Sequence, residues 1–154
     1  MLERVGDLFS YPGEWVGIPT NGKRYYNSGY AVMGAGVALS AKNRYPGIDR
    51  VLGFLLHTKG NHVHLLGCWD NRLVFNIPTK EHHQDGSPIE LIVQSCTELR
   101  ELYLDCDHKP RQVLLPRLGC GHGRLEWEDV RPAISKVLLE SAFILLEPGP
   151  TLTR

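Results

Sequence analysis

The sequence predicts an α/β fold in which helices cover both faces of a parallel or mixed sheet, and three observations carry that prediction. Short apolar runs alternate along the chain with segments whose apolar residues recur at helical spacing. A length of 154 residues and a hydrophobic fraction of 42% are sufficient for one domain with a sizeable core. No internal repeat, low-complexity tract or linker interrupts the chain. We therefore expect a single domain over residues 1–148, followed by a tail over residues 149–154.

The first half of the chain predicts a buried strand, a helix and a hairpin. The run EWVGIP, residues 14–19, is typical of a short buried strand that ends in Thr-Asn-Gly. After a polar loop, AVMGAGVALSAKNRY, residues 31–45, predicts a closely packed helix that stops before a Pro-Gly pair. Segments 62–69 and 72–78 flank an Asp-Asn pair, which predicts a tight turn between two strands.

The second half begins with the clearest helix start in the sequence. Ser87 is placed as the N-cap, Pro88 in the first turn and Glu90 as the partner in a capping box. Apolar residues then follow at helical spacing as far as Tyr103. Three further elements are predicted: a strand over residues 112–116, a helix over 127–142 and a strand over 143–148.

Three unusual loops follow predicted strands: residues 20–36, 78–87 and 117–125. Ligands of open α/β sheets gather where loops leave the carboxyl ends of strands, so we expect these loops to form one site.

Composition limits the classes of partner and compartment. Lysine plus arginine and aspartate plus glutamate both number 17, so bulk charge predicts no strong attraction to nucleic acid, although a local basic patch stays open. The opening MLERVGDLFS lacks the apolar core of a signal peptide, and no apolar run reaches membrane-spanning length. The four cysteines are scattered and form no disulfide framework. A reduced cytoplasmic protein is therefore expected.

Two glycine-rich segments predict a phosphate site. Residues 119–123 read Gly-Cys-Gly-His-Gly before one predicted helix, and residues 34–36 read Gly-Ala-Gly at the start of another. Glycines let backbone N–H groups converge on an anion, to which a helix N-terminus adds its positive end. Two such segments could hold both halves of a diphosphate. Either could also be a plain tight turn, and neither has the spacing of a Walker loop or of GxGxxG.

Four segments together resemble a macrodomain, the ADP-ribose-binding α/β/α sandwich with a mixed central sheet. They are GDLFSYP, IPTNG, AVMGAGVALSAKNRYPG and LPRLGCGHGRLEWEDV, and they occur in the family's order over nearly the whole chain. The Met-Gly-x-Gly helix start and the Pro-Arg-x-Gly-Cys-Gly loop are most similar to the branch of DNA ADP-ribosyl glycohydrolase antitoxins and the terminal ADP-ribose protein glycohydrolase.

The resemblance implies a set of ligand-binding residues. Asp7 matches the acid that accepts from the adenine amino group, and Asn21 matches the asparagine that faces the distal ribose, with Asn27 as a competitor because the loop is longer here. The remaining matches form the two diphosphate loops: Met33, Gly34, Ala35, Gly36 and Val37 in the first, and Gly119, Cys120, Gly121, His122 and Gly123 in the second.

Lys80 and Asn21 are the catalytic candidates that the resemblance implies. A lysine with a lowered pKa can attack the anomeric carbon of ribose and form a Schiff-base-type adduct, or it can stabilise charge on the departing group. A solvent-exposed loop lysine is the plain alternative. The terminal protein glycohydrolases carry an aspartate where this chain has Gly123, so their lysine and aspartate mechanism is in doubt here. His122 is a further acid or base candidate.

No metal and no cofactor is predicted. His82 and His83 are adjacent, so we expect their side chains to diverge, and no neighbouring ligand completes a zinc spacing. Cys120 and His122 supply only two ligands. Cys120 is expected to be a small buried residue of the loop wall rather than a nucleophile.

The sequence leaves three functions open. The first is an ADP-ribosyl glycohydrolase that removes ADP-ribose from DNA, a nucleotide or a protein. The second is a non-catalytic reader of ADP-ribose, for which Lys80 is dispensable. The third is a phosphatase acting on ADP-ribose-1″-phosphate, in which His122 could participate. ADP-ribose or an ADP-ribosylated substrate, including ADP-ribosylated DNA, is the expected partner in each case, and a membrane is not.

Overall fold

The computed structural model describes residues 1–149 and contains a six-stranded mixed sheet in the order β1-β6-β5-β2-β4-β3. All neighbouring pairs are parallel except β3 and β4, which form an antiparallel hairpin. In chain order the elements are β1 (Leu2–Val5), β2 (Trp15–Asn21), α1 (Gly36–Arg44), α2 (Ile48–Lys59), β3 (His64–Trp69), β4 (Arg72–Lys80), α3 (Ile89–Asp105), β5 (Val113–Pro116), α4 (Trp127–Ser135) and β6 (Phe143–Glu147).

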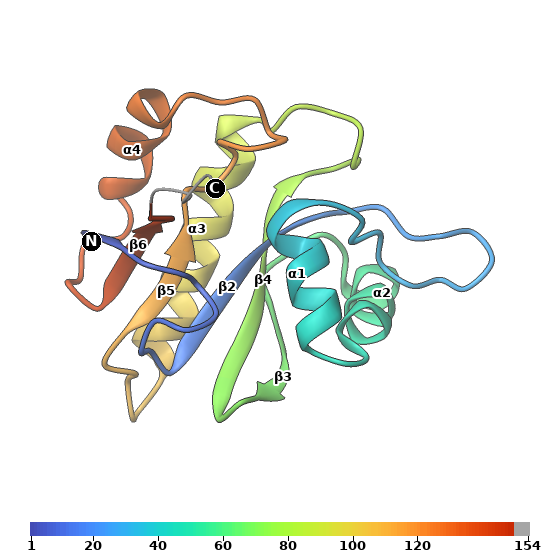
Figure 1. The fold of residues 1–154 in the computed structure, drawn as a ribbon, viewed down its shortest axis with the longest axis horizontal. Coiled ribbons are helices and arrows are strands. Elements are labelled where there is room, and N and C mark those ends of the chain that lie inside the picture. The colour runs from blue at the N-terminus through green and yellow to red at the C-terminus, as the bar shows by residue number, and fades with distance from the viewer. Residues whose placement is uncertain (150–154) are drawn as a thin grey trace, which may run out of the picture.

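Helices cover both faces of the sheet, so the predicted three-layer α/β/α architecture is confirmed (Figure 1). Helices α1 and α2 pack on one face, and α3 and α4 pack on the other. Alternate residues of β5 point to opposite cores: Leu114 packs with α1 and α2, whereas Val113 and Leu115 pack with α3 and α4. All three are buried because the strand lies in the middle of the sheet.

The hairpin between β3 and β4 is confirmed, and its turn has a clear physical basis. Asp70 and Asn71 have φ angles of 54° and 59°. Two successive residues in the left-handed region form the turn type that matches strand twist, and Asp and Asn tolerate that region better than most residues.

The predicted capping box at Ser87 is wrong. Helix α3 begins at Ile89 with Pro88 as its N-cap, and no side chain caps it. The Ser87 N–H donates instead to the carbonyl oxygen of Gly123, at 2.9 Å. Ser87 therefore ties the β4–α3 loop to the second glycine loop, a long-range role that local helix signals cannot reveal.

The predicted helix over residues 127–142 is too long, because α4 ends at Ser135. The chain turns after Ser135, and Leu138 beyond the turn is still buried in the core. Two elements were missed: β1 and α2. Helix α2 had a usable signal, since Ile48, Leu52 and Leu56 are spaced by four residues and all three are buried. Strand β1 is largely exposed at the edge of the sheet and has no such pattern. Most of the expected tail, residues 150–154, lies outside the described residues.

Within residues 1–149, no helix combines the length and apolar character needed to span a bilayer.

Candidate functional site

A cavity of about 440 Å³ opens at the carboxyl ends of β2, β4 and β5. All three unusual loops leave the sheet at this end, so the expectation that they share one site is confirmed (Figure 1). The wall is built mainly from these loops and the first turn of α1. It comprises Pro19, Thr20, Asn21, Tyr25, Val32, Gly34, Ala35, Gly36, Val37, Ala38, Thr79, Lys80, His83, Ser87, Pro116, Arg117, Gly119, Gly121, His122 and Gly123.

The structure brings most of the sequence-predicted residues together in this wall. They are Asn21, Gly34, Ala35, Gly36, Val37, Lys80, Gly119, Gly121, His122 and Gly123. Asn27, the competitor of Asn21, is exposed and lies outside the wall.

Three predicted residues, Asp7, Met33 and Cys120, are not in the wall. Asp7 is exposed in the turn after β1. Met33 is only 1% exposed because its side chain packs in the core under α1 and α2. Cys120 is half-buried against the other core, and its thiol donates to the Leu118 carbonyl oxygen at 3.4 Å, so it is neither the buried wall residue nor the cavity residue that was expected.

The first glycine loop presents the N-terminus of α1 to the cavity. Ala35 is the N-cap and supplies no side-chain hydrogen bond, and no acidic residue lies in the first turn. The first N–H groups of a helix have no intrahelical partner, so they are available to an anion. Gly36 adopts a φ of +56°, which favours glycine, whereas a Cβ at Gly34 would meet no atom within 4 Å.

The second glycine loop combines glycines that the fold requires with one that it does not. Gly119 has a φ of +75°, and a Cβ there would lie 2.6 Å from Ile92 Cδ1. A Cβ at Gly121 would meet nothing within 4 Å. The expectation that the following helix adds its positive end is wrong, because α4 begins only at Trp127 and contributes no residue to the wall.

A side chain at Gly123 would force this loop to shift. A Cβ at this position would lie 2.3 Å from Ser87 Oγ and 2.4 Å from the Gly119 carbonyl oxygen. An aspartate here, as in the protein glycohydrolases that the sequence resembles, would therefore require Ser87 and the loop at Gly119 to move. The two loops also approach each other, since a Cβ on Gly36 would lie 3.5 Å from the His122 ring.

Asn21 closes the base of the β2–α1 loop as well as lining the cavity. Its Nδ2 donates to the Val32 carbonyl oxygen, and its Oδ1 accepts from the Lys23 N–H, both at 2.9 Å. These bonds fix the side chain at the rim and leave one amide hydrogen free.

Lys80 is the last residue of β4 and is only 9% exposed, so it is not the solvent-exposed lysine of the plain alternative. Its Nζ donates to the carbonyl oxygens of His122, at 3.1 Å, and of His83, at 3.4 Å. Burial lowers the pKa of this amine below its ordinary value, the charge of Arg124 lowers it further, and Asp85 opposes both. A buried amine with a lowered pKa therefore lies between the β4–α3 loop and the second glycine loop.

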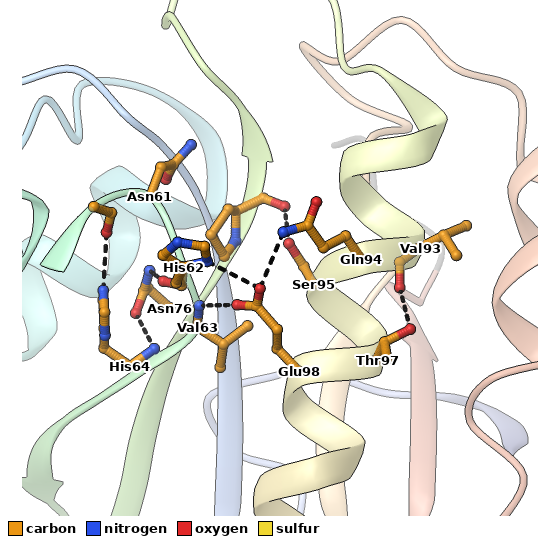
Figure 2. A network of polar contacts seen from close by, with 12 residues as sticks. Asn61, His62, Val63, His64, Asn76, Val93, Gln94, Ser95, Thr97 and Glu98 are labelled. Carbon is orange, nitrogen blue, oxygen red and sulfur yellow. Dashed lines mark hydrogen bonds and ion pairs between the residues drawn. The ribbon is translucent and has the colours of Figure 1, made fainter.

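A network of polar contacts connects β4 with α3 and with the segment between α2 and β3 (Figure 2). The buried Ser95 hydroxyl of α3 donates to the Pro78 carbonyl oxygen at 2.6 Å. The Asn61 amide donates to the Lys80 carbonyl oxygen at 3.0 Å, and the Asn76 amide donates to the His62 carbonyl oxygen at 2.8 Å. The network therefore holds the end of β4, and with it the backbone of Lys80, from both neighbouring segments.

Glu98 of α3 joins the same network from its other side (Figure 2). It accepts from the Val63 N–H at 2.9 Å and pairs with the His62 ring at 3.0 Å. Burial raises the pKa of Glu98, but hydrogen bonds from Val63, His62 and Gln94 outweigh it and hold the pKa below its ordinary value.

Sequence reasoning missed several wall residues, among them Tyr25, His83, Ser87 and Arg117. Ser87 and Thr20 have buried hydroxyl oxygens with no hydrogen-bond partner among the described residues. Buried polar atoms are normally paired, so two unpaired hydroxyls beside one cavity favour a polar ligand there. The local sequence held no signal for either residue, because their roles depend on which loops meet.

The expected divergence of His82 and His83 is wrong: their rings stack with centroids 4.4 Å apart. The His82 ring also accepts from the Gln84 N–H at 3.2 Å. Across residues 1–149, no three His, Cys, Asp or Glu side chains are grouped as metal ligands.

Known proteins of similar sequence are ADP-ribosyl hydrolases by name. The chain is 30% identical over 119 residues to the DNA ADP-ribosyl glycohydrolase of Thermus aquaticus, an alignment of 70% of this chain and 31% of that protein. It is 28% identical over 132 residues to human ADP-ribose glycohydrolase OARD1, covering 86% of this chain and 80% of that protein. This chain thus spans about a third of the first relative's length. No protein-family model matches it.

Solved structures of similar fold match this protein over nearly the whole chain. The macrodomain of Mycobacterium tuberculosis DarG has a TM-score of 0.77 at 25% identity and covers 96% of this chain and 97% of that one. The macrodomain of Thermus aquaticus DarG has a TM-score of 0.73 at 27% identity, covering 97% of both. Thermosipho africanus DarTG, solved with ADP-ribose, shares the fold at a TM-score of 0.75 and 22% identity, over 97% of this chain and 41% of that one. Together with the two glycine loops around one cavity, these likenesses show that the chain belongs to the macrodomain family.

Proposed function

We propose that this macrodomain binds ADP-ribose in the cavity and hydrolyses an ADP-ribosyl linkage, with Lys80 as the reacting group. The observation that carries the proposal is the position of Lys80. Its Nζ lies within 3.1 Å of the second glycine loop, inside a cavity that the α1 N-terminus also lines. A diphosphate held between the two glycine segments would fix the attached ribose beside this amine, and such positioning accounts for much of enzymatic rate enhancement.

The lowered pKa of Lys80 favours nucleophilic attack. The neutral amine would form a bond to the anomeric carbon with its lone pair, and the electrons of the broken linkage would leave with the acceptor. The proton released by the nitrogen goes to that acceptor. After the sugar ring opens, the adduct is an imine, which one water hydrolyses to free ADP-ribose and the restored amine. Since residue 123 is glycine, the lysine would act without an aspartate partner at this position of the loop.

DNA is the acceptor that we propose, because the relative at 30% identity is named a DNA ADP-ribosyl glycohydrolase. A modified protein is the competing substrate, since the human relative is named only an ADP-ribose glycohydrolase. We also propose the cytoplasm as location, supported by four free cysteines.

The test compares the wild type with Lys80→Ala for release of ADP-ribose from ADP-ribosylated single-stranded DNA. Lys136→Ala, which removes an exposed lysine outside the cavity wall, is the matched control. Titration of free ADP-ribose checks that each variant keeps its binding site. Release that collapses only in Lys80→Ala, with binding retained, supports the proposal, and reduction with cyanoborohydride should then trap a covalent adduct at Lys80.

Tight binding without release from DNA or protein would identify a reader instead. Release that persists in Lys80→Ala would move the chemistry to another residue, with the 1″-phosphate ester as the next substrate and His122 as the next variant. Absence of ADP-ribose binding would refute the proposed function as a whole.

A further inference from the structure

The segment between β2 and α1, residues 22–31, forms an ordered hairpin, which we call the tyrosine hairpin. Arg24 and Ala31 form a β-bridge. The Tyr25 N–H donates to the Tyr30 carbonyl oxygen at 2.8 Å, and the Gly29 N–H donates to that of Tyr25 at 2.9 Å. These bonds give the segment its own internal frame.

The tyrosine hairpin is anchored on α2 and extends past this helix at the edge of the molecule (Figure 1). A Cβ on Gly53 of α2 would lie 2.2 Å from the Gly29 carbonyl oxygen, so glycine allows a close backbone approach. The Ala31 N–H donates to the Asp49 carbonyl oxygen at 2.9 Å. The Arg24 guanidinium contacts the His57 ring nitrogen at 3.2 Å. The hairpin is therefore a fixed platform.

Three tyrosines on this platform face solvent. Tyr26 is 100% exposed, Tyr25 is half-exposed and Tyr30 is about one-third exposed. Tyr25 also lines the cavity, so the platform begins at the cavity rim. Arg50 of α2 lies over the Tyr30 ring at 5.8 Å from its centroid. Exposed aromatic side chains gathered on one segment of the surface are typical of a recognition surface.

The balanced net charge of the chain is unevenly distributed along the sequence. Between Gly22 and Gly60 the sequence has six lysines and arginines and one acid, Asp49, although the whole chain has 17 of each sign. The six are Lys23, Arg24, Lys42, Arg44, Arg50 and Lys59, and none forms an ion pair within residues 1–149. This segment holds the hairpin, α1 and α2, all on one side of the sheet (Figure 1). An excess of positive charge in the segment on this side of the sheet, with Lys23 and Arg24 in the hairpin itself, attracts a polyanion.

We infer that the tyrosine hairpin binds a single strand of nucleic acid beside the nucleotide that carries the ADP-ribosyl group. The inference rests on the proposed function. Unpaired bases stack on exposed aromatic rings while basic side chains follow the backbone phosphates. A polyanion that entered the cavity at Tyr25 would continue over Tyr26 and Lys23. An acidic peptide matches the charge but offers the tyrosines no bases to stack on.

The test measures the binding of an unmodified, fluorescein-labelled oligothymidylate of about 12 nucleotides, a length within the usual single-strand site size, by anisotropy. Tyr26→Ala removes a fully exposed ring, for which a loss of about fivefold or more in affinity is expected. Lys23→Ala should weaken binding and reduce the salt slope by about one. Leu139→Ala and Lys136→Ala, exposed positions between α4 and β6, are the matched controls and should bind as the wild type.

Calorimetry with free ADP-ribose, which should be unchanged in all four variants, separates the two proposals. Equal oligonucleotide affinity for wild type and Tyr26→Ala, or no oligonucleotide binding with ADP-ribose binding intact, would overturn this inference alone. Tighter binding of an acidic peptide of equal charge would overturn it in favour of a protein substrate. Tyr26-dependent strand binding in a protein that fails to bind ADP-ribose would leave the surface in place and refute the proposed function.

Discussion

Alanine substitutions in the glycine loops separate glycines that serve a ligand from glycines that serve the fold. Gly34 and Gly121 line the cavity, a Cβ on either would meet no atom within 4 Å, and neither has a positive φ. Alanine at such a position lowers the entropy of the unfolded chain and so raises the free energy of unfolding by about 0.4–1 kcal/mol. Gly34→Ala and Gly121→Ala should therefore raise the melting temperature by roughly 1–4 °C.

Gly123→Ala should have the opposite effect on stability. Its Cβ would lie 2.4 Å from the Gly119 carbonyl oxygen, a backbone atom that moves only if the loop moves. Overpacking of this kind costs about 1–3 kcal/mol, so the melting temperature should fall by roughly 2–12 °C.

The ligand-binding outcome distinguishes the glycines further. A methyl group at Gly34 or Gly121 would separate a diphosphate from backbone N–H donors, and losing one charge-assisted hydrogen bond of about 1.5–3 kcal/mol weakens binding roughly 10- to 100-fold. Calorimetry with free ADP-ribose measures this loss, and Gly149→Ala, which lies away from the cavity, is the control. Stable Gly34→Ala and Gly121→Ala variants that bind ADP-ribose like the wild type would refute backbone recognition of the diphosphate.

Three further predictions follow from the site and the core. The rate of ADP-ribose release should rise as the pH passes through the lowered pKa of Lys80, since the neutral amine is the nucleophile. In initial-rate assays, a rate that falls over this pH range would show instead that Lys80 acts as a cation. Ser95→Ala removes a buried hydrogen bond to β4, so it should lower the free energy of unfolding by about 1 kcal/mol and the melting temperature by roughly 2–4 °C in calorimetry. It should also lower kcat more than it changes KM. An unchanged kcat would show that Ser95 supports only the fold. Burial raises the pKa of Cys96 to about 12, whereas Cys68 is exposed. A thiol reagent at pH 8 should therefore react first with Cys68 and should label Cys96 only in denaturant. Labelling of Cys96 in the native protein would contradict the core packing.

Local sequence was sufficient where a feature depends on neighbours in the chain. The apolar runs identified the central strands, the Asp-Asn pair identified the hairpin turn, and the glycine clusters marked the two loops. Each of these signals arises from short-range sterics or from the period of a strand or helix. The resemblance to macrodomains added Lys80, which no local pattern would have separated from an ordinary loop lysine.

Local sequence failed where a residue acts across the fold. Ser87 has the form of a helix cap, yet its N–H binds Gly123 and its hydroxyl lies against the second glycine loop. The end of α4 was misplaced because the buried residues Val130, Ile134 and Leu138 keep helical spacing past Ser135, where the helix ends. Met33 belongs to the family motif, but its side chain fills the core instead of the cavity.

By itself, the sequence determined the layered fold, the glycine loops and a balanced total charge, because these depend on composition and short-range order. Only the tertiary structure decided that the positive charges of residues 22–60 gather on one side, and that Lys80 is buried between two loops. Charge distribution and desolvation depend on which distant segments pack together. The sheet order, which sets that packing, brings His122 within reach of Lys80 across 42 positions of the chain.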